Sequence, residues 1–171
     1  MTRMKTILET PRLLLREITP HDLGFVETML ADEETMRFYP QRYTRADAEA
    51  WVKRQVDRYG REGHGLWLVV GKETKQPVGQ VGLVNMLVEG EWMAETGYLV
   101  HRPYWRRGYA SEAALAVRDH AFTVLNKPFV VAQIREINVP SQGVARKLGM
   151  RRVKLNLHAG LEHTLWRVDR T

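Results

Sequence analysis

Two arginines and a glycine precede an alanine-rich run in residues 103–113, PYWRRGYASEA. Guanidinium groups bind phosphate through charge-assisted hydrogen bonds, and a glycine lets an anion approach the backbone. The first amides of a helix have no acceptor within the helix and attract anions. A phosphate site at Arg106, Arg107 and Gly108 is therefore predicted if this segment leads into a helix. A plain turn with solvated arginines is the alternative.

Several other kinds of site are excluded by what the sequence lacks. No lysine followed by serine or threonine comes after Gly108, as a P-loop requires, and the dinucleotide motif G-x-G-x-x-G is missing. The absence of cysteine excludes disulfides, thiolate zinc sites and a cysteine nucleophile. None of the six histidines forms the i, i+4 pair with a glutamate that zinc hydrolases use, so no metal is expected.

Length and charge limit the class of protein. The 171 residues predict one domain spanning 1–171. A net charge of +6 favours an anionic partner, and basic residues spread without a long block favour a local anion site over nucleic acid. No long uncharged apolar run or secretory signal is evident, so we expect a cytoplasmic protein with no membrane partner.

The elements that must position the arginine–glycine segment follow from apolar periodicity. Strands are predicted at 12–18, 66–70, 78–88, 92–100, 129–135, 150–157 and 163–168. Helices are predicted from Pro20 to about Leu30, from the Thr44 capping box to Tyr59, from Ala110 to Ala121, and over 138–148. One face of the second helix is expected to hold Ala48, Trp51, Val52, Gln55, Val56 and Tyr59.

This order of elements predicts a mixed α/β fold. Antiparallel strands in the middle of the chain are followed by a βαβ unit in the C-terminal half. The arginine–glycine segment is then the connection from the strand that ends at Val100 into the alanine-rich helix. That position is the one a phosphate site at a helix N-terminus requires.

Three separated segments resemble one family. They are TPRLLLR at 10–16, ETGYLV at 95–100 with PYWRRGYASEA, and NVPS at 138–141 with KLGM at 147–150, and EHTLW at 162–166 extends the likeness to almost the whole chain. Their order and spacing are similar to the GNAT acetyltransferase superfamily and, within it, the RimJ/RimL-like N-acetyltransferase branch. Trp105 stands where the superfamily usually has glutamine or arginine, as is common in that branch.

The resemblance implies a single GNAT-like domain with a central, mostly antiparallel twisted sheet flanked by helices. It also implies acetyl-CoA as cofactor, with its pyrophosphate on the backbone amides of Arg106, Arg107, Gly108, Tyr109, Ala110 and Ser111. Tyr98, Leu99 and Val100 would bind the pantetheine arm, with the Leu99 or Val100 amide as oxyanion donor. Asn138 is a cofactor contact, a helix N-cap or both, and Lys147 contacts the nucleotide or complements its helix C-terminus.

Transfer of an acetyl group to a primary amine needs a neutral amine and a proton for the departing thiol. By family analogy Glu95 is the candidate base and Ser141 the candidate acid. The alternatives are an exposed strand carboxylate paired with an arginine, and an ordinary first-turn serine. Alternation places Glu95, Gly97 and Leu99 on one face of their strand and Thr96, Tyr98 and Val100 on the other.

The acceptor amine stays open at this stage. An α-amine, with a pKa of about 7.7 to 8.0, needs less help than a lysine near 10.4. Residues 29–43 and 88–93 should shape its site, and their aromatic and acidic side chains suit a peptide N-terminus or a small amine. A catalytically weak acyl-CoA-binding sensor and a nucleic-acid-binding domain are the alternative functions, and a monomer and a homodimer are both compatible with the sequence.

Overall fold

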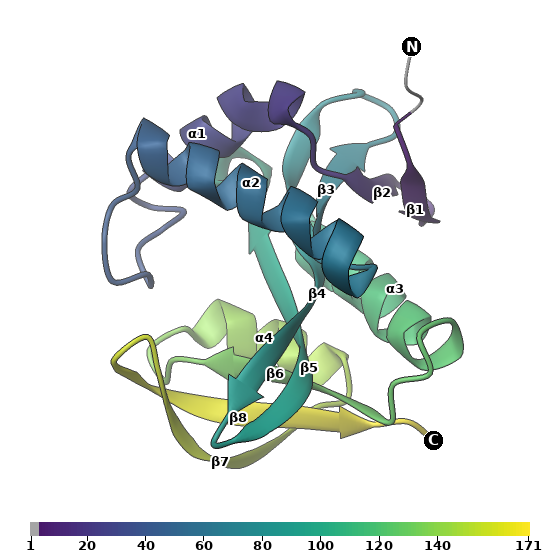
Figure 1. Ribbon diagram of the computed structural model, residues 1–171, viewed down its shortest axis with the longest axis vertical. Helices are drawn as coiled ribbons and strands as arrows, with labels where there is room; N and C mark the ends of the chain where they lie inside the picture. The colour runs from purple at the N-terminus through teal and green to yellow at the C-terminus, as the bar shows by residue number, and fades with distance from the viewer. Residues whose placement is uncertain (1–3) are drawn as a thin grey trace.

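The computed structural model describes residues 4–171, which form one eight-stranded sheet with helices on both faces (Figure 1). The strands lie in the order β1-β2-β3-β4-β5-β6-β8-β7, and the expected mixed α/β fold is confirmed. The elements are β1 (Thr6–Glu9), β2 (Leu13–Glu17), the 3-10 turn η1 (Pro20–Asp22), α1 (Leu23–Ala31), α2 (Arg45–Glu62), β3 (Leu66–Gly71), β4 (Pro77–Val88), β5 (Glu91–Val100), the 3-10 turn η2 (Arg102–Tyr104), α3 (Tyr109–Thr123), β6 (Phe129–Ile134), α4 (Val139–Lys147), β7 (Arg151–His158) and β8 (Leu161–Asp169).

Alternation along β3 divides the hydrophobic core between the two faces of the sheet. Trp67 and Val69 belong to a cluster with residues of α3, whereas Leu68 between them belongs to a cluster with α1 and α2. Successive side chains of a strand point to opposite faces, so each helix pair covers its own apolar surface. Among the described helices, none is long and apolar enough to cross a bilayer.

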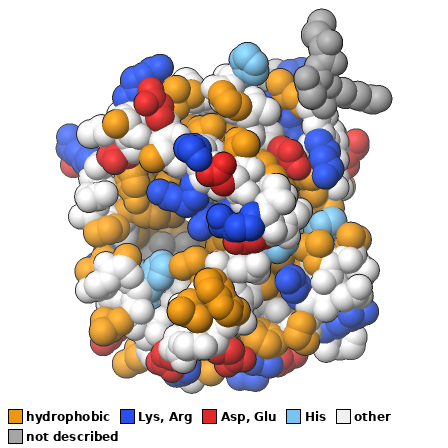
Figure 2. All heavy atoms as spheres, in the orientation of Figure 1, with side chains coloured by type: hydrophobic (Ala, Val, Ile, Leu, Met, Phe, Trp, Pro, Cys, Tyr) orange, Lys and Arg blue, Asp and Glu red, His pale blue; other side chains and the backbone are white. Residues whose placement is uncertain are grey.

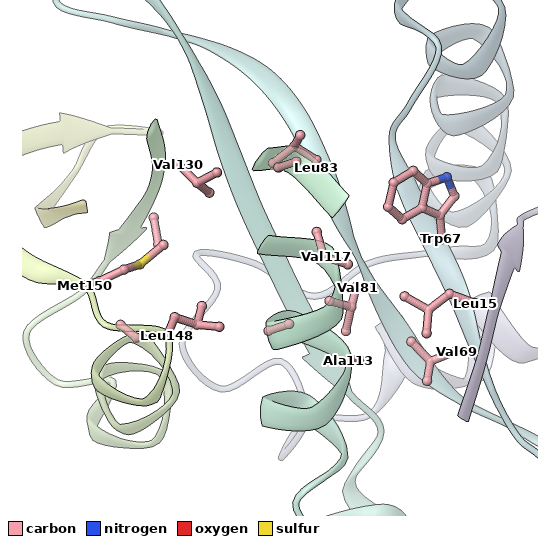
Figure 3. Close-up of a cluster of buried hydrophobic side chains, with 14 of the residues drawn as sticks. Leu15, Trp67, Val69, Val81, Leu83, Ala113, Val117, Val130, Leu148 and Met150 are labelled. Carbon is pink, nitrogen blue, oxygen red and sulfur yellow. The ribbon is translucent and has the colours of Figure 1, made fainter. Parts of the chain in front are cut away.

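Small residues let α3 lie close to the sheet. Ala113, Ala114, Val117 and Ala121 are fully buried, and Val117 and Ala113 face Val81 of β4 in the core (Figure 3). Close packing of the helix fixes the position of its N-terminus, which begins immediately after the arginine–glycine segment. The core therefore sets where the predicted phosphate site lies.

The predicted helices form, with two corrections. The Thr44–Asp47 capping box is present, and Gly63 in the left-handed region, φ 79°, ends α2. Val56 is 40% exposed, so the prediction that it shares the buried face of α2 was wrong, because it lies one position beyond that face. Pro20 opens a separate 3-10 turn before α1 and not the α-helix itself.

The N-terminal strand β1 was missed by the sequence analysis. It has four residues and pairs with β2 across a register shift, so its signal is short. Glu112 of α3 fixes the segment after it, since the carboxylate accepts hydrogen bonds from Thr10 Oγ1 at 2.5 Å and Arg12 Nε at 2.7 Å. The segment between β1 and β2 is thereby tied to the first turn of α3.

The sheet opens between its two halves. β4 and β5 pair antiparallel from Gly79–Val100 to Val88–Glu91. The expected βαβ unit is confirmed by the parallel pairing of β5 with β6, and within residues 4–171 this register contains the single pair Glu95–Val131. The C-terminal half of β5 therefore runs on without a strand beside it on the β6 side.

Two leucines of β4 test the packing against α3. Leu83 is fully buried and Leu87 is 55% exposed. Replacing a buried leucine by alanine removes apolar contacts and leaves a cavity, so Leu83→Ala should lower the free energy of unfolding by about 2–5 kcal/mol, and Leu87→Ala by less than about 1 kcal/mol. Urea denaturation measures both, and equal losses would contradict the assignment of the core.

Candidate functional site

The arginine–glycine segment forms a bent loop that ends in the N-terminus of α3. Arg106 and Gly108 both adopt left-handed backbone conformations, with φ of 62° and 77°, and Gly108 is the N-cap residue of the helix. The Glu112 amide donates to the Gly108 carbonyl. The amides of Tyr109, Ala110 and Ser111 precede that bond and have no acceptor within the helix, which is the arrangement that binds phosphate.

Cations surround this loop unequally. The Arg12 guanidinium lies 4.7 Å from the centre of the Tyr109 ring, and a Cβ added at Gly108 would meet Arg12 Nη2 at 3.4 Å. Arg107 is exposed, lies over the Tyr104 ring and does not line the adjacent cavity, unlike Arg106. Arg12, which the sequence analysis placed only in a strand, is therefore a further cation beside the loop.

A cavity of about 400 Å³, here named the loop cleft, lies against this segment. Its walls come from the loop, the end of β5, the first turn of α4 and the segment between α1 and α2. The predicted residues that line it are Tyr98, Leu99, Val100, Arg106, Gly108, Tyr109, Ala110, Ser111, Asn138 and Ser141. Trp105 closes one side, where its Nε1 donates to the Val100 carbonyl at 2.7 Å.

The direction of the backbone amides distinguishes the residues of β5. The His101 amide donates to the Val78 carbonyl of β4. Backbone groups alternate along a strand, so the Leu99 amide also faces β4, whereas those of Tyr98 and Val100 face the side where β6 no longer pairs. Tyr98 and Val100 can therefore donate to a molecule in the loop cleft.

The first turn of α4 is held from two directions. Asn138 Oδ1 accepts from the Ser141 amide at 3.2 Å, which confirms the helix N-cap alternative for Asn138. The Tyr98 hydroxyl donates to the Ser141 carbonyl at 2.7 Å and joins β5 to α4. Lys147 lies exposed in the last turn of α4, where its charge complements the helix dipole.

A second cavity of about 310 Å³, here named the aromatic cavity, adjoins the loop cleft. Both are lined by Phe38, Tyr39, Tyr98, Asn138 and Ser141. The aromatic side chains of Tyr43 and Trp51 also line the aromatic cavity. So do the polar side chains of Glu95, Gln133, Arg135, His158 and His163.

The second region expected to shape the acceptor site lies elsewhere. Residues 88–93 form the tip of the β4–β5 hairpin, where Trp92 is 69% exposed and Glu89 forms an ion pair with Lys154 of β7. None of these side chains lines the aromatic cavity. Only the aromatic part of the expectation, in the segment before α2, is therefore brought to the site.

Glu95 is a half-buried carboxyl group that lines the aromatic cavity. Burial raises its pKa from 4.5 to about 7, against a hydrogen bond from Gln133 and the field of Arg58, which both favour the ionised form. Gln133 Nε2 donates to Glu95 Oε2 at 2.7 Å. No lysine or arginine in residues 4–171 forms an ion pair with the Glu95 carboxylate. The exposed ion-paired alternative for Glu95 was wrong, and a group of this pKa can exchange protons near neutrality.

A polar network that sequence analysis missed supports Glu95. Asn156 of β7 donates to Gln133 Oε1, and His158 Nδ1 lies 3.4 Å from Gln133 Nε2. Burial and the neighbouring His163 lower the pKa of His158 and favour its neutral form. These residues come together only when β6, β8 and β7 pair, and no triplet of histidine, aspartate or glutamate in the described part of the chain is arranged to hold a metal.

Positive charge gathers beside the aromatic cavity. Lys and Arg side chains lie over α2 in the middle of the face in Figure 2. Arg54 lies over the ring of Trp51, a cavity residue, and Arg58 acts on Glu95. These two arginines favour anionic over cationic groups beside the cavity.

Comparison with known protein families shows to which family the chain belongs. Residues 12–151 match the family model of the Acetyltransferase (GNAT) domain. The chain belongs to the GNAT family. The match includes β2 to α4, so it covers the loop, the loop cleft and Glu95, and the expected membership is confirmed.

Other GNAT proteins share the sequence and the fold. The Bacillus subtilis protein named uncharacterized N-acetyltransferase YnaD is 30% identical over 146 residues, which are 85% of this chain and 82% of that protein. An acetyltransferase from Agrobacterium tumefaciens superposes with a TM-score of 0.83 at 27% identity, over 99% of this chain and 97% of that one. RimL, a ribosomal L7/L12 alpha-N-protein acetyltransferase solved with coenzyme A, shares the fold with a TM-score of 0.80 at 14% identity, over 96% and 98%.

Two glycines with left-handed backbones test whether the arginine–glycine loop of this GNAT protein binds phosphate. Gly108→Asp strains the loop and adds a negative charge at the N-terminus of α3, so it should weaken coenzyme A binding at least about tenfold. Gly90→Asp, at φ 82° in the β4–β5 turn, carries the same strain and charge away from the loop and should leave affinity unchanged. Calorimetric titration with coenzyme A measures both affinities. An unchanged affinity in Gly108→Asp would refute the phosphate site in the loop.

Proposed function

We propose that this GNAT protein transfers the acetyl group of acetyl-CoA to the primary amine of an acceptor by direct attack, without a covalent enzyme intermediate. The observation that carries the proposal is the junction of the two cavities. A cleft with free helix amides meets a cavity with a carboxyl group of pKa about 7, and Ser141 and Tyr98 line both. Donor and acceptor can thus be held on opposite sides of one boundary.

The loop cleft has the groups that coenzyme A requires. The amides of Tyr109, Ala110 and Ser111 and the side chain of Arg106 would hold the pyrophosphate. The Tyr98 and Val100 amides, which face the open side of β5, would bind the pantetheine arm. Acetyl-CoA supplies the acetyl group as an activated thioester, and the coenzyme A complex of the structurally similar RimL supports this assignment.

Glu95 provides the proton acceptor on the other side. Its carboxylate would take a proton from the incoming ammonium, so that the neutral nitrogen forms the new N–C bond while the C–S bond breaks. Of the two protons that the ammonium loses, one balances the departing thiol and the other reaches solvent through Glu95. The hydrogen bond from Gln133 at 2.7 Å holds the ionised carboxylate in position.

Ser141 is proposed as the donor to the sulfur. Its backbone is fixed by the Asn138 cap and by the Tyr98 hydroxyl. Within residues 4–171 its hydroxyl has no hydrogen-bond partner, and the side chain lies at the boundary of the cavities. A serine whose backbone is held at that boundary can give its hydroxyl proton to a leaving group.

Activity should be lost as pH falls through about 7, because Glu95 must be ionised to accept a proton. A hydrazide acceptor, which is already neutral over this range, needs no deprotonation by Glu95 and should show a much smaller loss, so it serves as the control for the amine acceptor. Glu95→Gln should lower kcat by about 100-fold or more and abolish the loss of activity near pH 7. Steady-state assays of thiol release from pH 5 to 9 measure both effects.

Glu91→Gln is the matched control, because Glu91 starts the same strand and is exposed. It should retain the wild-type rate and pH profile. Slow turnover that neither Glu95→Gln nor Ser141→Ala alters would overturn the proposed roles and favour a sensor that binds acyl-CoA without efficient catalysis.

A further inference from the structure

Arg135 brings a permanent positive charge into the aromatic cavity. It follows β6 and lies two residues after Gln133, so the two side chains leave the same face about 6.6 Å apart along the strand. Arg135 Nη1 donates to the Phe38 carbonyl at 3.0 Å. Within residues 4–171 no carboxylate forms an ion pair with it, so its other donors have no charged partner.

An uncompensated guanidinium is costly in a half-buried site. Taking a cation out of water requires a partner of opposite charge or a full set of hydrogen bonds. Among the described residues, 4–171, Glu95 is the only acidic one that lines this cavity, and Gln133 donates a hydrogen bond to it. A carboxylate on the acceptor would pair with Arg135 through two parallel hydrogen bonds.

From this arrangement we infer that the acceptor is a free α-amino acid with an apolar or aromatic side chain. The inference rests on the proposed acetyl transfer. The amine of the acceptor would face Glu95 of β5. Its carboxylate would face Arg135, which lies on the same face as Gln133, two residues further along the chain. Phe38, Tyr43 and Trp51 would surround the side chain.

Size and aromatic packing agree with a small acceptor. At about 310 Å³ the cavity is at the lower end of the range for small-molecule sites. The rings of Tyr43 and Trp51 pack edge to face at 5.8 Å, and Tyr39 packs on Tyr43 at 6.4 Å. These contacts join three of the aromatic side chains that line the cavity.

The charges disfavour the other amines. A polyamine would present a second cation to Arg135 and to the basic residues of α2, and would find no carboxylate besides Glu95. A peptide N-terminus would offer Arg135 only a neutral carbonyl. The ion pair is available only to an acceptor that carries its own anionic group.

Acetylation kinetics of the full chain test the inference. The acceptors are phenylalanine, leucine and methionine, each beside its C-terminal amide and the amine that lacks the carboxylate. For each acceptor we compare kcat/KM of Arg135→Gln with wild type, so that the differing basicity of the amines cancels. Arg135→Gln should lower kcat/KM at least about tenfold for the free amino acids and less than about twofold for the amides and amines.

Arg151→Gln is the control, because Arg151 of β7 is exposed and pairs with Asp169 of β8. This substitution should change none of these ratios. Equal losses for all acceptors would mean that Arg135 only holds Phe38, and would overturn the inference. If the free amino acids are acetylated without any dependence on Arg135, and no faster than their amides, the inference is overturned in favour of a peptide N-terminus, with the acetyl transfer still standing. Coenzyme A binding without acetylation of any amine would overturn both proposals.

Discussion

The separation of β5 from β6 is the constraint on which both cavities depend. The two strands pair at Glu95 and Val131, and beyond that point the described part of the chain places no strand beside the Tyr98 and Val100 backbone amides. Buried amides without partners are costly, so the gap is stable only because other contacts hold its edges. These are the α3 packing on one side, and the Tyr98–Ser141 and Trp105–Val100 hydrogen bonds on the other.

Glu95 shows how the site uses energy that the rest of the fold supplies. Because burial raises its pKa from 4.5 to about 7, the folded state prefers the protonated acid. The stability gained by this preference is complete below pH 4.5 and is lost as pH rises to about 7. The ionised carboxylate of Glu95 therefore lowers the stability of the fold, and the side-chain amide of Gln133, which Asn156 holds, limits that loss.

Local signals predicted the arginine–glycine loop and the start of α4, whereas long-range strand pairing determined the aromatic cavity. Gly108 before an alanine-rich helix and Asn138 before Ser141 are patterns in which neighbouring residues fix the geometry, so the loop and the cap could be found from sequence. The network of Gln133, Asn156 and His158 spans β6 and β7, which contact through β8. No spacing in the chain reveals that register, and the same holds for Arg135, whose partner Phe38 is 97 residues away.

The contact between Glu112 and the N-terminal segment also bears on how the protein is made. Thr10 and Glu112 are separated by 102 residues, so the first strands cannot reach their final place until the start of α3 has left the ribosome. Closing so long a loop is slow compared with forming a helix or a hairpin. During synthesis, the face of β2 that carries Leu13 and Leu15 therefore stays uncovered until α3 emerges, even though β2 can already pair with β3.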